Sequence, residues 1–136
     1  MNVLIDINII LDAVMNRTPY ADAAQKLFLL AAEDSINASI TANSVTDIYY
    51  LVNKSYRNVE QSKQVLLKLF TLFKIADATG IDCQKALDLN MSDYEDALVA
   101  TIAKRIKADY IVTRNLKDFE NSPIPAVSAE NFVKKL

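Results

Sequence analysis

Apolar residues along the chain occur in two patterns, which are short continuous runs and longer stretches with helical spacing. Short runs predict strands over residues 2–6, within 35–40, over 74–77 and over 110–113, and the first and last of these are the clearest. Helical spacing predicts helices over 7–15, over 21–32, over 59–73, over 82–89, over 93–106 and after Ser128. It also predicts a helix that runs through Val52 and that either Asn43 or Ser44 can cap. Strands and helices therefore alternate along most of the chain.

This alternation predicts the fold class. Strands separated by helices are joined by crossover connections, and such connections produce parallel sheets covered by helices on both faces. We therefore expect an α/β protein with a three-layer α/β/α sandwich and a mainly parallel central sheet. A chain of 136 residues suits one domain over residues 1–136, which buries roughly two thirds of the surface of the unfolded chain.

Composition predicts a cytoplasmic protein. The chain is 51% hydrophobic, yet no apolar run approaches the roughly 18 residues that a membrane span requires. Asp6 and Asp12 interrupt the only apolar stretch near the N-terminus, which does not fit a secretion signal. Cys83 is the only cysteine, so the chain cannot form an internal disulfide.

Two residue types are nearly or entirely missing, and this excludes several kinds of site. The chain contains no histidine, so histidine-based triads, histidine general bases and histidine-containing zinc sites are excluded. Gly80 is the only glycine, and a phosphate-binding loop needs several. Any hydrolytic chemistry would therefore depend on carboxylates, most plausibly on carboxylates that hold a hard cation such as Mg²⁺ or Mn²⁺.

Asp6 ends the first apolar run, and Asn8 follows two residues later. In open parallel sheets the ligand crevice lies outside the carboxyl ends of the strands, so an acid here suits a metal or phosphate site. The alternative is a helix cap, because Asp and Asn serve equally well as N-caps. We favour the functional interpretation because the strand before Asp6 is so apolar.

Asp96 lies near the start of the predicted helix 93–106. Ser92 and Glu95 have the spacing of a capping box, which gives Asp93 and Glu95 an adequate role as acids near the positive end of the helix. Asp96 has no such role, because the residues three and four positions further along are apolar and place its carboxylate on the inward face. An inward acid is costly unless it is paired or binds a metal, so Asp96 is the strongest functional candidate.

Two further segments offer polar groups after predicted strands. Asp47 lies on the helix that follows the second strand, where a capping box with Ser44 explains it about equally well. The stretch 113–119 follows the last clear strand and offers Thr113, Asn115 and Asp118. A polar turn in which Asn caps a short helix explains this stretch nearly as well.

Charge and aromatic content neither favour nor exclude a nucleic-acid substrate. A net charge of −2 and a pI near 5.1 do not suit a protein that coats nucleic acid, although a small basic patch would suffice for an enzyme. The cations within 104–107 are best explained as a solvated helix end. Nucleobases could stack on three tyrosines, Tyr49, Tyr50 and Tyr56, but aromatic residues at helical spacing more often lie in a core or an interface.

Three segments together resemble the signature blocks of the PIN domain family. They are Leu4-Ile5-Asp6-Ile7-Asn8, Glu95-Asp96-Ala97-Leu98-Val99-Ala100, and Asp109-Tyr110-Ile111-Val112-Thr113-Arg114-Asn115-Leu116-Lys117-Asp118-Phe119. Their order and spacing and the total length agree with the family over essentially the whole chain. Within the family, the chain resembles the VapC-like toxins and their stand-alone bacterial or archaeal relatives.

The resemblance implies a Mg²⁺- or Mn²⁺-dependent endoribonuclease with its acidic site at the edge of the sheet, acting as the toxin of a type II toxin–antitoxin pair. Asp6 and Asp96 match the two most dependable metal-binding acids of the family, and Asp47 would complete the catalytic set. The metal would activate a water for in-line attack on an RNA phosphodiester. The supporting residues would be Asn8, Asp93, Thr113, Asn115 and Asp118, with Arg114 holding the RNA strand.

Two departures from the family pattern leave alternatives open. Asp47 stands where the family usually has Glu, and Asn115 stands where many members have Asp, which puts a second metal in doubt. One alternative is therefore a catalytically silent PIN-like module that binds RNA or protein. Another is a haloacid-dehalogenase-like phosphatase, which is the weaker because that chemistry wants an acid where this chain has Asn8.

The expected partners are an RNA substrate, a cognate antitoxin and a second copy of the chain, without a membrane. The helices over 21–32 and 59–73 are the candidate surfaces for an antitoxin or a homodimer, although ordinary core packing is the preferred explanation of their apolar residues until an exposed apolar patch is found.

Overall fold

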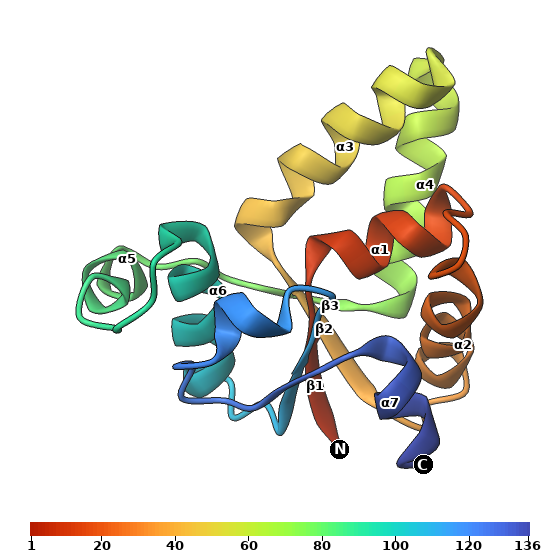
Figure 1. Ribbon diagram of the computed structural model, residues 1–136. Helices are drawn as coiled ribbons and strands as arrows, with labels where there is room; N and C mark the ends of the chain where they lie inside the picture. The colour runs from red at the N-terminus through yellow and green to blue at the C-terminus, as the bar shows by residue number, and fades with distance from the viewer.

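The computed structural model describes all 136 residues and has a central sheet between two layers of helices (Figure 1). In chain order the elements are β1 (Asn2–Ile5), α1 (Ile7–Val14), α2 (Ala21–Ala32), β2 (Asn37–Thr41), α3 (Ala42–Tyr56), α4 (Val59–Leu72), β3 (Lys74–Ala76), α5 (Gly80–Ala86), α6 (Tyr94–Arg105), β4 (Tyr110–Val112), the 3₁₀ helix η1 (Leu116–Phe119), β5 (Ala126–Val127) and α7 (Ala129–Lys134). The predicted α/β/α architecture is confirmed.

The sheet has five strands in the order β3-β2-β1-β4-β5, and all four pairings are parallel. The chain moves outward from β1 to β2 and β3, and then returns to place β4 on the other side of β1. Leu4 of β1 is thus paired with Ser39 of β2 on one side and with Ile111 of β4 on the other. The strand order reverses beside β1, and such a switch point opens a crevice at the carboxyl ends of the strands.

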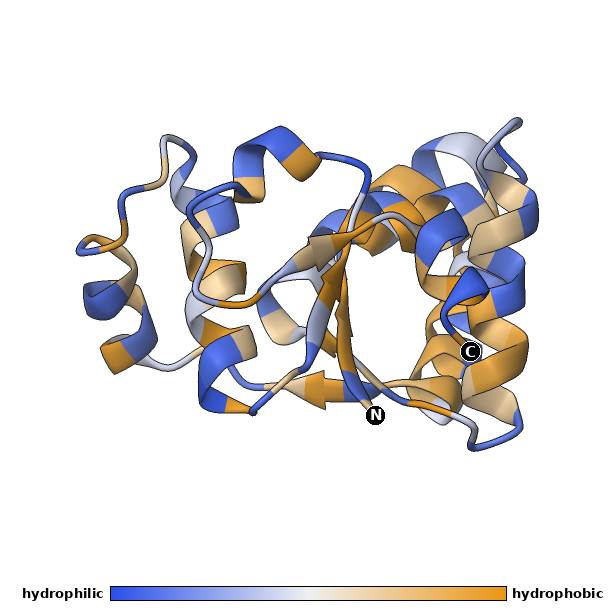
Figure 2. Cartoon of the chain, turned by 60° about the horizontal axis from the view of Figure 1, so that its bottom comes forward, coloured by the Kyte–Doolittle hydropathy of each residue, from blue (hydrophilic) through white to orange (hydrophobic).

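Alternate residues of β1 pack into separate cores on the two faces of the sheet. Val3 and Ile5 belong to the larger core, which also contains residues of α1, α2, α3, α4 and α7. Leu4 belongs to a smaller core with Val99 and Ala100 of α6. Because successive side chains of a strand point to opposite faces, a continuous apolar run suits a strand that is covered on both sides. Figure 2 shows the apolar strands enclosed between the helices.

Helices α3 and α4 form a hairpin whose outer end projects beyond the sheet (Figure 1). Arg57, at the end of α3, has a φ of 52°, and Asn58 then caps α4 by accepting a hydrogen bond from the Gln61 amide at 3.0 Å. The inner end of α3 follows β2 directly, so the first turns of this helix lie beside the carboxyl ends of the strands. The hairpin therefore contributes one wall of the crevice.

The structure corrects several predicted boundaries. β5 was not predicted, because only two residues beside Pro125 form it. α3 begins at Ala42 with Thr41 as its N-cap, so Asn43 and Ser44 are not the caps. The helix predicted over 82–89 is α5, which lies over 80–86 because Thr79 and Asp82 form a capping box before it. No helix has both the length and the apolar character needed to cross a membrane.

Candidate active site

A cavity of about 400 Å³ lies at the carboxyl ends of β1 and β4, between the first turns of α1, α3 and α6 and the segment around η1. Its lining consists of Asp6, Ile7, Asn8, Asn43, Ser44, Asp47, Tyr50, Leu51, Asp93, Glu95, Asp96, Val99, Asn115 and Asp118. Six of these are acids, and none is a lysine or an arginine. We call this cavity the acidic pocket.

Asp6 connects the sheet to α1 and is buried, with 6% of its surface exposed. Its backbone amide donates to the Val112 carbonyl of β4 at 2.9 Å, which continues the pairing of the two strands. Its Oδ1 caps α1 by accepting from the Ile7 amide at 2.9 Å. Asp6 therefore both caps α1 and lines the acidic pocket. Burial raises the pKa of Asp6, and the hydrogen bonds from Thr113 and Ile7 oppose that rise.

Thr113 positions Asp6 and does not line the acidic pocket. Its side chain is fully buried, and its Oγ1 donates to Oδ2 of Asp6 at 2.8 Å. The same oxygen accepts from the Asn115 amide at 3.0 Å, which directs the hydroxyl proton toward the carboxylate. Thr113 therefore acts on the pocket only by orienting Asp6, because its own hydroxyl is enclosed.

The first turn of α6 brings three acids to the opposite side of the pocket. Asp93 is the N-cap, and its Oδ1 accepts from the Asp96 amide at 3.0 Å, so the predicted capping box of Ser92 and Glu95 is wrong. Asp96 is partly buried and its carboxylate makes no hydrogen bond. Burial, with added repulsion from Asp93, Asp6, Asp118 and Glu95, raises the pKa of Asp96 to about 7.

Polar residues of α3 and two asparagines of other elements complete the lining. Asp47 is exposed and has no side-chain hydrogen bond, so the capping box with Ser44 is absent; the Ser44 hydroxyl instead pairs with that of Thr41 at 2.7 Å. Asn43, which the sequence suggested only as a helix cap, has a buried Oδ1 without a hydrogen-bond partner. Asn8 and Asn115 add further carboxamides from the other side of the pocket, and Asp118 adds an acid.

The structure does not bring Arg114 to the acidic pocket. Its guanidinium pairs with Asp12, with Nε 2.8 Å from Oδ2 and Nη2 donating to Oδ1 at 3.2 Å. It also lies 4.2 Å from the ring centre of Tyr20, in a separate cavity of about 350 Å³. The expectation that Arg114 holds a substrate strand in this pocket therefore does not fit its position.

Asp12 was missed as a residue of structural importance. It is completely buried, and Arg114 joins it to the loop after β4, with Arg17 4.0 Å away on the other side. Burial raises the pKa of Asp12, and the charge of Arg114 opposes that rise. Its immediate neighbours Leu11 and Ala13 are also buried, so the nearly continuous apolar run around it was the available signal of an acid inside the core.

The donor set of the acidic pocket fits a hard divalent cation in part. Carboxylate and carboxamide oxygens are the ligands that Mg²⁺ and Mn²⁺ prefer, and no basic side chain in the lining competes for them. No three acidic side chains converge into a complete ligand set. Mg²⁺ commonly binds through one or two carboxylates and keeps several waters, so a lining in which fewer than three acids converge is compatible with it.

A parallel α/β/α sandwich with an acidic pocket at its switch point defines the class of this protein. The family model described as PIN domain matches residues 2–117. The chain therefore belongs to the PIN domain family, as its three sequence blocks predicted. No curated protein sequence matches the chain significantly.

Several solved structures share the fold. VapBC2 from Rickettsia felis, bound to a DNA fragment from its promoter, aligns with a TM-score of 0.70 and 23% identity, covering 94% of this chain and 98% of that chain. A toxin–antitoxin complex from Klebsiella pneumoniae aligns with a TM-score of 0.67 and 19% identity, covering 93% and 97%. FitAcB from Neisseria gonorrhoeae aligns with a TM-score of 0.66 and 16% identity, covering 94% and 98%. At these identities the likeness shows the fold alone.

Proposed function

We propose that this PIN domain protein is a Mg²⁺- or Mn²⁺-dependent endoribonuclease, and that it is the toxin of a type II toxin–antitoxin pair. The observation that carries the enzymatic part is the uncompensated charge of the acidic pocket. Six acids line it without a lysine or arginine, and their mutual repulsion contributes to raising the pKa of Asp96 to about 7. A purely structural role leaves this electrostatic cost unexplained, whereas a bound divalent cation would offset it.

Within this proposal Asp6 and Asp96, which both line the pocket, would hold the cation. When bound, the cation would supply an activated water and would screen the charge that develops on the scissile phosphate. Thr113 fixes the orientation of the Asp6 carboxylate through its 2.8 Å hydrogen bond. Asp93 holds the first turn of α6 in place, and so holds the backbone that carries Asp96.

Asp47 supplies the remaining catalytic carboxylate in this proposal. It is exposed, makes no hydrogen bond and lines the pocket from α3, so it is free to accept the proton of the attacking water. The pocket is also lined by Asn8, Asn115 and Asp118. The carboxamides of the two asparagines would donate hydrogen bonds to phosphate oxygens of the RNA.

Cleavage of labelled single-stranded RNA with added Mn²⁺ tests the enzymatic part. We expect the wild-type protein to cut the RNA, and Asp6→Asn and Asp96→Asn to lose roughly 100-fold or more in rate. Asp88→Asn is the matched control, because Asp88 is exposed and lies outside the pocket. Equal cleavage by all four proteins would assign the activity to a contaminant.

Calorimetric titration with Mn²⁺ separates the nuclease from a silent binding module. A nuclease of this kind should bind Mn²⁺ in a manner that depends on Asp6, whereas a module that has lost its metal should release no such heat. The same titration of Asp88→Asn should reproduce the wild type.

The proposed antitoxin and homodimer rest on the toxin–antitoxin complexes that share the fold and on exposed apolar side chains of the helices predicted as partner surfaces. Leu29 of α2 and Leu67 and Phe70 of α4 are all exposed. Measurement of the native mass, with and without the product of an adjacent gene, tests both partners.

A further inference from the structure

Tyr50 is an exposed aromatic residue at the rim of the acidic pocket. Its side chain is 64% exposed, and it lies on α3 one turn after Asp47. Four of the other five tyrosines have partners: Tyr20 lies against Arg114, Tyr56 donates to the Val14 carbonyl, Tyr94 donates to the Cys83 carbonyl, and Tyr110 packs edge-on against Phe132. Tyr49 also has no partner, but it is half-buried and does not line the pocket. Tyr50 has neither a hydrogen bond at its hydroxyl nor an aromatic or cationic partner for its ring.

The acidic pocket has two chemically different sides. The first turn of α6 and the segment around η1 contribute most of the acids, namely Asp93, Glu95, Asp96 and Asp118. The α3 side contributes one acid, Asp47, with the polar residues Asn43 and Ser44, and it adds the larger uncharged surfaces of Tyr50 and Leu51. A ligand that fits both sides combines a group attracted to a bound cation with a flat group that stacks on an aromatic ring.

A nucleotide of single-stranded RNA has this combination. Its phosphate would face the acids and their cation, while its base presents a flat π-face. Base stacking on an aromatic side chain is worth about 1–3 kcal/mol per base and tolerates any sequence. An exposed ring without a partner leaves its face available for such contact.

We propose that Tyr50 is the stacking platform for the nucleobase next to the scissile phosphate. The inference rests on the proposed ribonuclease function and adds to it a residue that binds the substrate. In a duplex both faces of each base are already stacked on neighbouring bases, so a duplex cannot place a base on this ring. Tyr50 is then a substrate-binding residue, distinct from the acids that hold the cation.

Binding of fluorescein-labelled RNA, measured by anisotropy, tests the proposal. All proteins carry Asp47→Asn, which removes the proposed proton acceptor and keeps both proposed cation ligands, and binding is measured with added Mn²⁺. The probes are one mixed-sequence strand and its duplex with the complement. We expect Tyr50→Leu to weaken binding of the single strand roughly 5-fold or more, which corresponds to about 1 kcal/mol or more. Tyr50→Phe keeps the ring and should remain within about twofold of the parent. The duplex should bind equally to all three.

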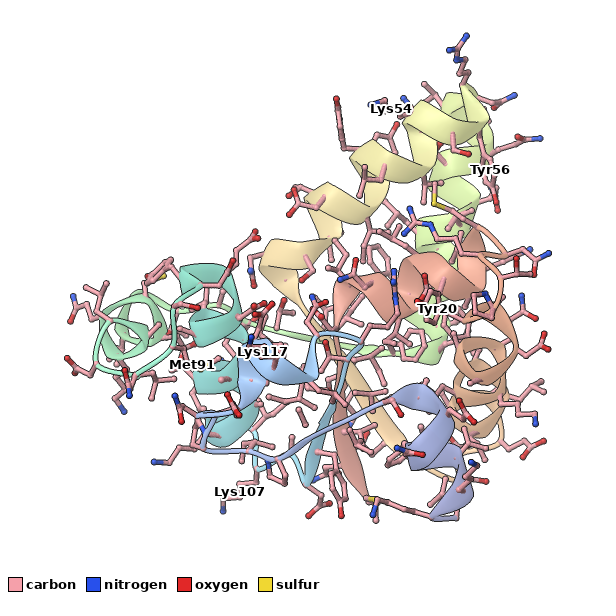
Figure 3. All side chains as sticks on the ribbon, viewed as in Figure 1. Tyr20, Lys54, Tyr56, Met91, Lys107 and Lys117 are labelled. Carbon is pink, nitrogen blue, oxygen red and sulfur yellow. The ribbon has the colours of Figure 1, made fainter.

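Tyr56→Leu is the control, because Tyr56 lies on the same helix near the outer end of the hairpin, away from the pocket (Figure 3). Thermal denaturation establishes that each variant folds. A second probe, the same strand carrying 2-aminopurine, should show quenched fluorescence with the parent and with Tyr50→Phe, and less quenching with Tyr50→Leu.

Equal binding by Tyr50→Leu and Tyr50→Phe would overturn the proposal, as would an equal loss on single strand and duplex, or a parent that binds no single-stranded RNA. If Tyr50→Leu instead alters only the native mass or antitoxin binding, the ring belongs to a protein interface. Cleavage by the protein with an intact Asp47 is measured separately, so a failure of this inference is distinguishable from a failure of the ribonuclease proposal.

Discussion

Replacement of Asp96 by Asn should stabilise the metal-free protein at alkaline pH. The pKa of this carboxyl rises from 3.8 to about 7 on folding, and its carboxylate has no hydrogen bond to lose. Between these two values the folded state binds more protons than the unfolded state, so stability of the wild type falls as pH rises from about 4 to 7. The asparagine variant carries no charge at this position, so its stability should not fall for this reason.

The size of the effect follows from the pKa difference. A pKa change of one corresponds to about 1.4 kcal/mol, so a rise from 3.8 to about 7 sets an upper limit of about 4 kcal/mol. Because Asp96 is only partly buried, solvent screens much of the repulsion, and we expect about 1–2 kcal/mol. For a chain of this length that is a rise in Tm of about 3–6 °C.

Thermal denaturation in EDTA at several pH values between about 4.5 and 8.5 measures the effect. The two proteins should differ little at the acidic end of this range, and Asp96→Asn should be the more stable at about pH 8. Added Mn²⁺ should stabilise the wild type more at about pH 8 than at about pH 6, since the ligand must be ionised, and should stabilise the variant much less. A variant that is no more stable than the wild type at the alkaline end in EDTA would refute the repulsion inferred from the pocket.

Two further substitutions test the groups that shape the site. Thr113→Val removes the hydroxyl that donates to Asp6 and should lower the free energy of unfolding, measured by urea denaturation, by about 1–2 kcal/mol. The pKa of Asp6 should rise further, so any RNA cleavage should require a higher pH. Thr113→Ser should restore both properties. Arg114→Gln removes the nearer partner of buried Asp12 and leaves only Arg17, 4.0 Å away, so it should cost about 2–3 kcal/mol at about pH 8 and less toward acidic pH, where Asp12 is protonated. Lowered RNA affinity with unchanged stability would instead restore Arg114 as a substrate ligand.

The sequence predicted the layers of the fold because its strongest patterns coincide with burial. Val3, Leu4 and Ile5 are all buried, as expected for a strand covered on both faces, and this run also located Asp6 at the end of β1. β5 escaped prediction because two residues carry no periodicity, and its pairing with β4 depends on the neighbouring strand. Local patterns thus predicted the elements, while pairing partners came from the tertiary structure.

Five of the six acids of the pocket were candidates from the sequence, since parallel strands bring their carboxyl ends to one edge. The exception is Glu95, which the sequence indicated only as an acid near the positive end of the helix. The partners of the side chains were not predictable. Arg114 and Thr113 are adjacent in sequence, yet one pairs with Asp12 and the other with Asp6. Which side chain points into the pocket depends on residues about a hundred positions away, and a single sequence does not record those contacts.

The hydrogen bond between Thr113 and Asp6 has a consequence for biosynthesis. It joins residues 107 positions apart, and β4, which directly precedes Thr113, pairs with the first strand to be made. A nascent chain that has reached β3 therefore has Asp6 but lacks Asp96 and Thr113. The acidic pocket is therefore incomplete until α6, β4 and the segment around η1 have been translated.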